Sequence, residues 1–155
     1  MTATAAPPDS AEIAAIILKN MPLEGPLLPI LHDMQANFGC VPDAARPQIA
    51  DALNITEAEL HGVISFYHDF RREPAGKHVL KICRAEACQA MGANDLSDKV
   101  LELLGLDWHG TSSDGRVTVE PVYCLGLCAC GPAAMVNGKV RGRVSAEALV
   151  EEVSA

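Results

Sequence analysis

Four of the six cysteines occur as two close pairs, and thiolates gathered in this way can bind iron or zinc. Cys83 and Cys88 are separated by four residues, and Cys124 and Cys128 by three. The 35 residues between the pairs are enough for a helix and a strand to bring the chain back. Four thiolates at one point can hold an iron–sulfur cluster, so the pattern favours electron transfer.

Other uses of these cysteines remain open on spacing alone. Zinc also accepts four cysteines, as in a zinc-stapled interaction module, although this combination of spacings is unusual for structural zinc. A thiol oxidoreductase would carry a Cys-x-x-Cys pair, whereas the first loop here is two residues longer. A Rieske centre would need two histidines closely spaced with two cysteines, and the five histidines do not provide them.

The two remaining cysteines have different interpretations. Cys40, within Phe38-Gly-Cys-Val-Pro42, is predicted to be a small buried hydrophobic residue. Cys130 lies two residues after Cys128 and is an alternative ligand that spacing does not exclude. We expect Gly131-Pro132 to turn Cys130 away from the other thiols.

Composition excludes several classes of protein. A net charge of −8 opposes phosphate backbones, and an aromatic content of 4% is too small for a base-stacking surface, so nucleic acid is excluded as a partner. The longest strongly apolar stretch, residues 13–18, is far shorter than the roughly 20 residues that cross a bilayer. The N-terminus lacks the pattern of a secretory signal. We expect a soluble, cytoplasmic protein with reduced cysteines.

The first half of the chain indicates helices. After a predicted disordered tail over residues 1–10, apolar residues recur at helical spacing, which predicts a helical domain over 11–72. Gly39 is expected to end the second helix, because glycine accepts positive φ without steric cost. Pro47 conflicts with an uninterrupted helix after Val41. Thr56-Glu-Ala-Glu59 matches a capping box and predicts the start of a further helix.

In the second half of the chain the spacing of the apolar residues is no longer purely helical, and it predicts an α+β domain over 77–155. The expected strands are 78–83, 116–122, 133–136 and 139–144. Asn137-Gly138 indicates a tight type I′ hairpin between the last two strands. We expect Cys88 to open a helix that turns Leu103 and Leu104 inward, and Ser145 to cap a final helix. The order β-α-β-β-β-α, with a cysteine loop after the first strand, resembles a thioredoxin-like fold.

Several segments form a recognisable set across residues 13–153. They are Leu28-Pro-Ile-Leu-His32, Phe38-Gly-Cys-Val-Pro42, Gly62-Val-Ile-Ser-Phe-Tyr-His68, Gly76-Lys-His-Val-Leu-Lys-Ile-Cys83 and Val119-Glu-Pro-Val-Tyr-Cys-Leu-Gly-Leu-Cys128. This set resembles the 24-kDa [2Fe–2S] subunit of NADH dehydrogenases. The resemblance implies a helical domain that binds a flavin-carrying partner, followed by a thioredoxin-like domain with one [2Fe–2S] cluster. It also implies the ligands Cys83, Cys88, Cys124 and Cys128.

Two segments suggest a narrower assignment. Ser65-Phe-Tyr-His-Asp-Phe-Arg71 and Cys83-Arg-Ala-Glu-Ala-Cys-Gln-Ala-Met-Gly92 are most similar to the gamma subunits of soluble, molybdenum-containing, NAD-dependent formate dehydrogenases. This similarity implies that FMN, NAD and the molybdenum cofactor reside on partner subunits, including a flavin/NAD-binding subunit and a formate-oxidising molybdenum subunit. NADH:quinone oxidoreductases and NAD-reducing hydrogenases use similar subunits and remain alternatives. Cys40 and the extra thiol of Cys130 depart from the family pattern.

The chain is expected to support electron transfer without a catalytic residue or substrate site of its own. It contains neither a dinucleotide fingerprint nor a P-loop motif. Backbone N–H groups in the two cysteine loops are expected to donate to sulfur. Phe66, Tyr67 and Phe70 are predicted to contact the flavin subunit, and Trp108 to lie in the core. Nearby cations are interpreted as solvated surface charges: Lys81, Arg84, Lys139, Arg141 and Arg143.

Overall fold

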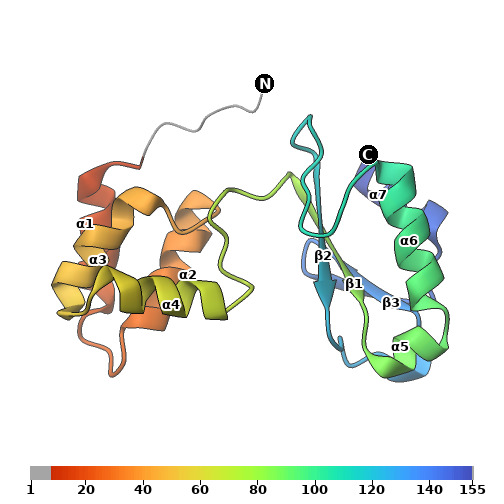
Figure 1. Cartoon of the computed structure of the whole chain (residues 1–155), viewed down its shortest axis with the longest axis horizontal. Coiled ribbons are helices and arrows are strands. Elements are labelled where there is room, and N and C mark those ends of the chain that lie inside the picture. Colours follow the sequence, from red (N-terminus) through yellow and green to blue (C-terminus); the bar gives the residue numbers. More distant parts are fainter. Residues whose placement is uncertain (1–7, 155) are drawn as a thin grey trace. The chain divides into compact units, whose positions relative to one another are not determined.

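The computed structural model describes residues 8–154, which form two compact units with a boundary between Pro74 and Ala75 (Figure 1). Each unit has its own hydrophobic core. Of the predicted disordered tail, residues 1–7 lie outside the described residues, and Ser10 begins the first helix. Within residues 8–154, no helix combines the length and the apolar character that a bilayer crossing requires.

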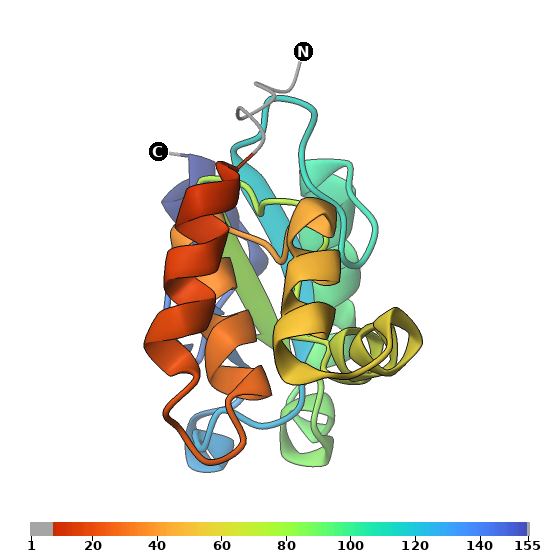
Figure 2. The same ribbon diagram turned by 90° about the vertical axis from the view of Figure 1, so that its left-hand side faces the viewer.

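The N-terminal unit is built from helices, as its sequence pattern predicts. They are α1 (Ser10–Asn20), α2 (Leu27–Phe38), the 3-10 turn η1 (Asp43–Ala45), α3 (Arg46–Leu53) and α4 (Glu57–Phe66). Helix α1 packs against both α2 and α3 (Figure 2). The fully buried side chains in the core of this unit include Ile13, Ile30, Met34, Ile49 and Leu60. Their aliphatic spacing explains why these segments are helical.

Local signals fix the ends of these helices. The Thr56 hydroxyl accepts from the Glu59 N–H, while the Glu59 carboxylate accepts from the Thr56 N–H at 2.8 Å, so the predicted capping box is confirmed. Gly39 ends α2 at φ 75°, as expected. Pro47 occupies the first turn of α3, where no N–H is needed, because η1 lets the helix begin only at Arg46.

The C-terminal unit contains a mixed sheet of four strands in the order β2-β1-β3-β4. The strands are β1 (His78–Cys83), β2 (Val117–Val122), β3 (Ala133–Val136) and β4 (Lys139–Gly142). Strands β1 and β2 are parallel, and the other two pairings are antiparallel. The helices are α5 (Glu86–Ala90), α6 (Ala93–Leu104) and α7 (Ala146–Ser154), with the 3-10 turn η2 (Cys128–Cys130) before β3.

Helices α6 and α7 pack against each other on one side of this sheet (Figure 1). They cover the apolar side chains of β1 and β2, including Leu80, Ile82 and Val119, which are fully buried. Asn137 and Gly138 both have positive φ, 49° and 79°, so the predicted type I′ hairpin between β3 and β4 is confirmed. The predicted α+β class is also confirmed, and so is the predicted sequence of elements along the chain, β-α-β-β-β-α, apart from a division of its first helix.

Three details differ from the sequence expectation. The helix that the sequence predicts after the first strand is divided into α5 and α6, because Gly92 takes a left-handed conformation at φ 87°. Cys88 therefore lies inside the short α5 rather than opening one long helix. Leu103 is 53% exposed, so its predicted inward position is wrong, and Leu104 takes the inner side of the last turn. Strand β4 stops at Gly142 because Arg143 has φ 52°, which is incompatible with a strand.

Candidate metal centre

The topology of the sheet brings both cysteine loops to one edge. Cys83 is the last residue of β1, and its register partner in the parallel strand β2 is Val122. Cys124 follows Val122 by two residues, so the two chains leave the sheet side by side. Cys88 is the middle residue of the short helix α5, which follows the loop after β1. The chain direction of two parallel strands therefore places both pairs at the same end of the sheet.

The thiols are close within each pair and interact between pairs. The Sγ atoms of Cys124 and Cys128 are 3.8 Å apart, and the thiols of Cys83 and Cys88 hydrogen-bond to each other. The charge of Cys128 helps to raise the pKa of Cys88, and the charge of Cys83 helps to raise the pKa of Cys128, so the two pairs are within electrostatic range of each other. Cys83 and Cys88 are buried, whereas Cys124 and Cys128 are exposed. The site thus has a protein-facing half and a surface-facing half.

Backbone N–H groups point at these sulfur atoms. Gly126 donates to the Sγ of Cys124 at 3.4 Å. Burial raises the pKa of Cys83, but N–H donors from Ala85, Cys124 and Leu125, together with the Cys88 thiol, lower its pKa overall. Such donors favour thiolate over thiol, and they also stabilise the sulfurs of iron–sulfur centres. The N–H donors expected from the sequence are therefore present in both loops.

The two neighbouring thiols in each pair also compete for protons. Burial, followed by the hydrogen bond with Cys83, raises the pKa of Cys88. The hydrogen bond with Cys124 is the largest cause that raises the pKa of Cys128. A pair of thiols this close cannot lose both protons easily unless a cation offsets the charge. The chemistry of the donor set therefore matches that of a metal-binding site.

Cys124 is exposed and has a strained backbone conformation. Cys124 has φ 82°, although it is not glycine, and Gly126 follows at φ 77°. A non-glycine residue in this region costs of the order of 1–3 kcal/mol and is often found at functional sites. The strained turn curls the loop so that the Gly126 N–H reaches the Cys124 sulfur.

The arrangement in pairs fits a binuclear cluster. Among residues 8–154, no group of three or more His, Cys, Asp or Glu side chains is arranged to hold a metal ion. A [2Fe–2S] cluster contains two irons and takes four cysteine ligands, so two neighbouring pairs of thiols match its donor set.

The remaining cysteines lie in different environments. Cys130 is half-buried in η2, where its N–H donates to the Leu127 carbonyl at 2.8 Å. Its Cβ packs against Gly142 of β4, since a Cβ added to Gly142 would lie only 2.8 Å away. Cys40 is 7% exposed within the N-terminal unit, so its predicted burial is confirmed, and burial raises its pKa. The exclusion of Cys130 as a ligand stays a prediction.

Exposed apolar side chains flank the surface-facing thiols. Tyr123, next to Cys124, is 71% exposed, and Met91, just after α5, is 60% exposed. Sequence reasoning did not single out either residue, although their positions beside the cysteine loops were available as a signal. In the N-terminal unit, Phe66 and Tyr67 are exposed and Phe70 is buried. Trp108, predicted to be core, is only partly buried.

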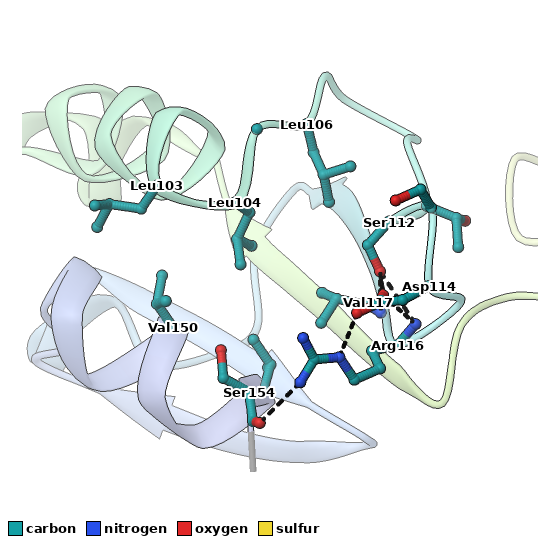
Figure 3. Close-up of a pocket in the computed structure, with 13 residues that line it drawn as sticks. Leu103, Leu104, Leu106, Ser112, Asp114, Arg116, Val117, Val150 and Ser154 are labelled. Carbon is teal, nitrogen blue, oxygen red and sulfur yellow. Dashed lines mark hydrogen bonds and ion pairs between the residues drawn. The ribbon is translucent and has the colours of Figure 1, made fainter.

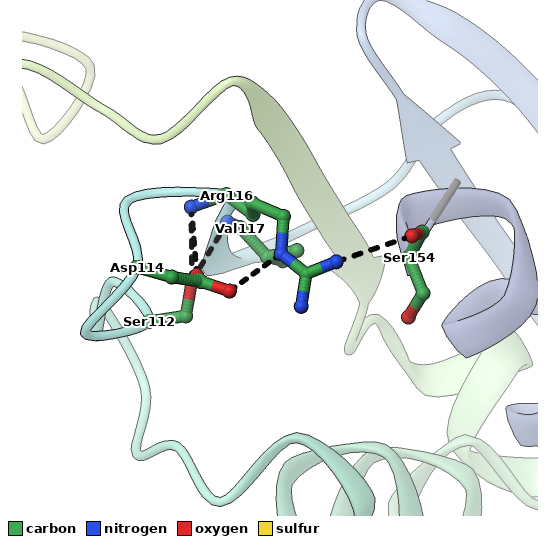
Figure 4. A network of polar contacts seen from close by, with 5 residues as sticks. All are labelled: Ser112, Asp114, Arg116, Val117 and Ser154. Carbon is green, nitrogen blue, oxygen red and sulfur yellow. Dashed lines mark hydrogen bonds and ion pairs between the residues drawn. The ribbon is translucent and has the colours of Figure 1, made fainter.

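A separate pocket of about 550 Å³ lies at the opposite end of β2 from the cysteines (Figure 3). Leu104, Leu106 and Val150 form its apolar side. Its polar side is a closed network, in which Arg116 donates from Nε to Asp114 at 2.5 Å and from Nη1 to the Ser154 carbonyl (Figure 4). Because these charges already neutralise each other, we assign this pocket no ligand.

Comparison with known families decides the affiliation of the chain. A family model described as "Thioredoxin-like [2Fe-2S] ferredoxin" matches residues 13–155. The chain belongs to this family. The match confirms the predicted thioredoxin-like fold, and it agrees with a [2Fe–2S] cluster as the cofactor.

Curated relatives support the same family. An NADP-reducing hydrogenase subunit, HndA of Solidesulfovibrio fructosivorans, is 35% identical over 122 residues, which cover 79% of this chain and 71% of the relative. An NADH-quinone oxidoreductase subunit from Pseudomonas aeruginosa is 33% identical over 125 residues, which cover 81% of this chain and 75% of the relative. The resemblance to subunits of NADH dehydrogenases is thereby confirmed at the level of the family.

Among solved structures, a hydrogenase shares the fold of most of the chain. An NAD+-reducing [NiFe]-hydrogenase in the air-oxidized state matches with a TM-score of 0.68 and 23% identity. The match covers 83% of this chain but only 22% of that hydrogenase chain. It therefore shows the fold alone.

Proposed function

We propose that this chain is the [2Fe–2S] electron-transfer subunit of a soluble, cytoplasmic, NAD-dependent formate dehydrogenase. Cys83 and Cys88 would bind one iron, and Cys124 and Cys128 the other. The observation that carries this proposal is the presence of two thiol pairs at one edge of the sheet, with backbone N–H donors aimed at their sulfurs. Membership of the thioredoxin-like [2Fe–2S] ferredoxin family supports the choice of cluster.

The residues of the chain would hold and tune the cluster. When bound, a [2Fe–2S] cluster accepts and releases one electron at a time. The buried pair, Cys83 and Cys88, would anchor the cluster in the protein, and N–H donors from Ala85, Leu125 and Gly126 would favour its more negative state. No side chain needs to transfer a proton, so this role requires no catalytic residue in the chain itself.

A partner subunit would receive or deliver the electron. Cys124 and Cys128 are on the exposed side of the site, where Tyr123 and Met91 also present apolar surface to solvent. Aromatic residues and methionine are enriched at protein interfaces. We propose that a flavin/NAD-binding subunit covers this surface and holds FMN near the cluster. The cluster would then accept or store electrons from the FMN. The exposed Phe66 and Tyr67 offer a second contact from the helical unit.

The parent complex is the most specific part of the proposal. Formate dehydrogenase, with its molybdenum cofactor on a further subunit, rests on the resemblance of residues 65–71 and 83–92. The relatives named above instead belong to an NADP-reducing hydrogenase and an NADH-quinone oxidoreductase. An equivalent subunit in either type of complex is the alternative.

Purification of the intact complex separates these possibilities. A tagged copy of the full chain would be recovered from its native host with its partners. Co-purifying molybdenum and formate-dependent reduction of NAD would support formate dehydrogenase. Nickel with hydrogen-dependent reduction, or quinone reduction by NADH, would reject formate dehydrogenase and keep the electron-transfer role.

A further inference from the structure

Arg84 is fixed between the two cysteine loops. It directly follows Cys83, and its N–H donates to the Val122 carbonyl at 2.8 Å, just before the Cys124 loop. Its own carbonyl accepts a hydrogen bond from Nε2 of Gln89 in α5 at 2.8 Å. Both elements that carry the proposed ligands thus hold the backbone of Arg84.

The guanidinium of Arg84 is held by an aromatic ring. Its Cζ atom lies 5.2 Å from the ring centroid of Trp108, which is within cation–π distance. Its Nη2 lies 3.4 Å from Oδ1 of Asn94, at the start of α6. Its Nε is buried and has no hydrogen-bond partner. The contacts therefore orient the cation and remove part of its hydration without adding a negative charge.

Several other cations of the unit are paired with carboxylates. Lys81 lies 3.5 Å from Glu120, and Arg141 lies 2.8 Å from Glu152. Arg84 forms no ion pair with any carboxylate in the described part of the chain. A buried or half-buried cation is usually paired with an anion. An unpaired cation beside a ligand loop is therefore unusual and suggests that its charge has a role there.

From these contacts we propose that Arg84 places a fixed positive charge beside the cluster, and that this charge raises the reduction potential of the cluster. This inference rests on the proposed [2Fe–2S] function. Reduction adds one electron and hence one negative charge to the cluster. A fixed, unneutralised cation beside the ligand loop stabilises that charge, and net charge around a cluster helps to set its potential. Trp108 keeps the cation in place. The interpretation of Arg84 as a solvated surface charge is thereby replaced.

The test is a redox titration of the full chain, monitored by the EPR signal of the reduced cluster. Arg84→Gln should lower the reduced-to-oxidised ratio at a fixed potential about tenfold, a shift of 59 mV for one electron. Arg84→Lys keeps the charge and should recover most of the shift. Lys77→Gln is the matched control, because Lys77 lies six residues before Cys83 on extended chain, roughly 20 Å away. It should change the ratio less than twofold.

A second variant tests the same role independently if Arg84→Gln fails to bind the cluster. Trp108→Leu leaves the arginine present but removes the ring that holds it, and should lower the potential in the same direction by a smaller amount. If the variants bind the cluster with the wild-type potential, the role of Arg84 is rejected while the proposed function stands. If the wild-type chain itself binds no [2Fe–2S] cluster, the proposed function fails, and this inference fails with it.

Discussion

Replacing Gly142 by alanine tests how the fold supports the cysteine site. Gly142 ends β4, and an added Cβ would lie 2.8 Å from the Cys130 Cβ and 3.0 Å from the Cys130 carbonyl oxygen. Gly142 does not have positive φ, so alanine can adopt its backbone conformation and the close contact alone decides the outcome. Cys130 shares the turn η2 with Cys128. A displacement of η2 would therefore also move Cys128, which is a proposed ligand.

The expected cost combines two opposing effects. Carbon atoms pack best at about 3.5–4.0 Å, so β4 or η2 must move by at least about 0.7 Å. Overpacking of this kind costs about 1–3 kcal/mol. Alanine also restricts the unfolded chain, which stabilises the folded state by about 0.4–1 kcal/mol. The clash exceeds this gain, and we expect Gly142→Ala to lower the free energy of unfolding by roughly 1–2 kcal/mol.

Urea unfolding followed by the fluorescence of Trp108 measures this change. Trp108 is the sole tryptophan and packs against the core of the C-terminal unit, so its signal reports that unit. With a slope of about 1 kcal/mol per molar urea, the midpoint should fall by about 1–2 M. The visible absorbance of the cluster should be lost at lower urea concentration than in the wild type.

Two further variants isolate the contact. Gly62→Ala makes the same chemical change in α4, where the added Cβ meets no atom within 4 Å beyond the neighbouring backbone of its own helix, and it should leave the Trp108 transition unchanged. Adding Cys130→Gly to Gly142→Ala removes the closer contact and should restore at least about 0.5 kcal/mol beyond additivity. An unchanged or raised midpoint for Gly142→Ala, or strict additivity in the double variant, would refute the reasoning.

Three other predictions follow from the site and its supporting elements. Serine substitution of any one proposed ligand should abolish or alter the EPR signal of the cluster, whereas Cys130→Ser should retain it; loss of the signal in Cys130→Ser would reverse the ligand assignment. Hydrogen bonds from Ser112 and Arg116 lower the pKa of Asp114 to about 2 from 3.8, so its ionised form contributes stability above pH 4 that disappears as pH falls toward 2. Asp114→Asn should therefore lower the urea midpoint at pH 6, and its difference from the wild type should shrink through that window; a difference independent of pH would contradict this. Thr56→Ala should destabilise the N-terminal unit by about 1 kcal/mol in urea melts followed by circular dichroism, and Thr56→Ser should not.

The sequence predicted those features that depend on a few neighbouring residues. The Thr56 capping box and the Asn137-Gly138 hairpin carry their own hydrogen-bonding or φ requirements, so they could be identified without tertiary contacts. Apolar residues likewise identified β1, β2 and β3, because each of these strands buries part of its length in the core. The sequence also placed both cysteine pairs at strand ends, where parallel pairing brings them to one edge.

Features that depend on distant residues could not be predicted in the same way. The stack of Arg84 on Trp108 joins residues 24 positions apart, and the approach of Gly142 to Cys130 requires the β3-β4 hairpin to be in place. Leu103 fits an apolar pattern, but the contact of α6 with α7 decides which side of its last turn is covered. Gly92 could have signalled a break in the helix, since glycine weakens helix interiors.

Metal analysis and EPR on a single anaerobic sample would show whether the four cysteines bind one [2Fe–2S] cluster. We expect about two irons and about two inorganic sulfides per chain, no EPR signal in the oxidised protein, and a spin-half signal after reduction by dithionite. A colourless protein that contains one zinc per chain and shows no redox response would contradict the account and make the cysteines structural.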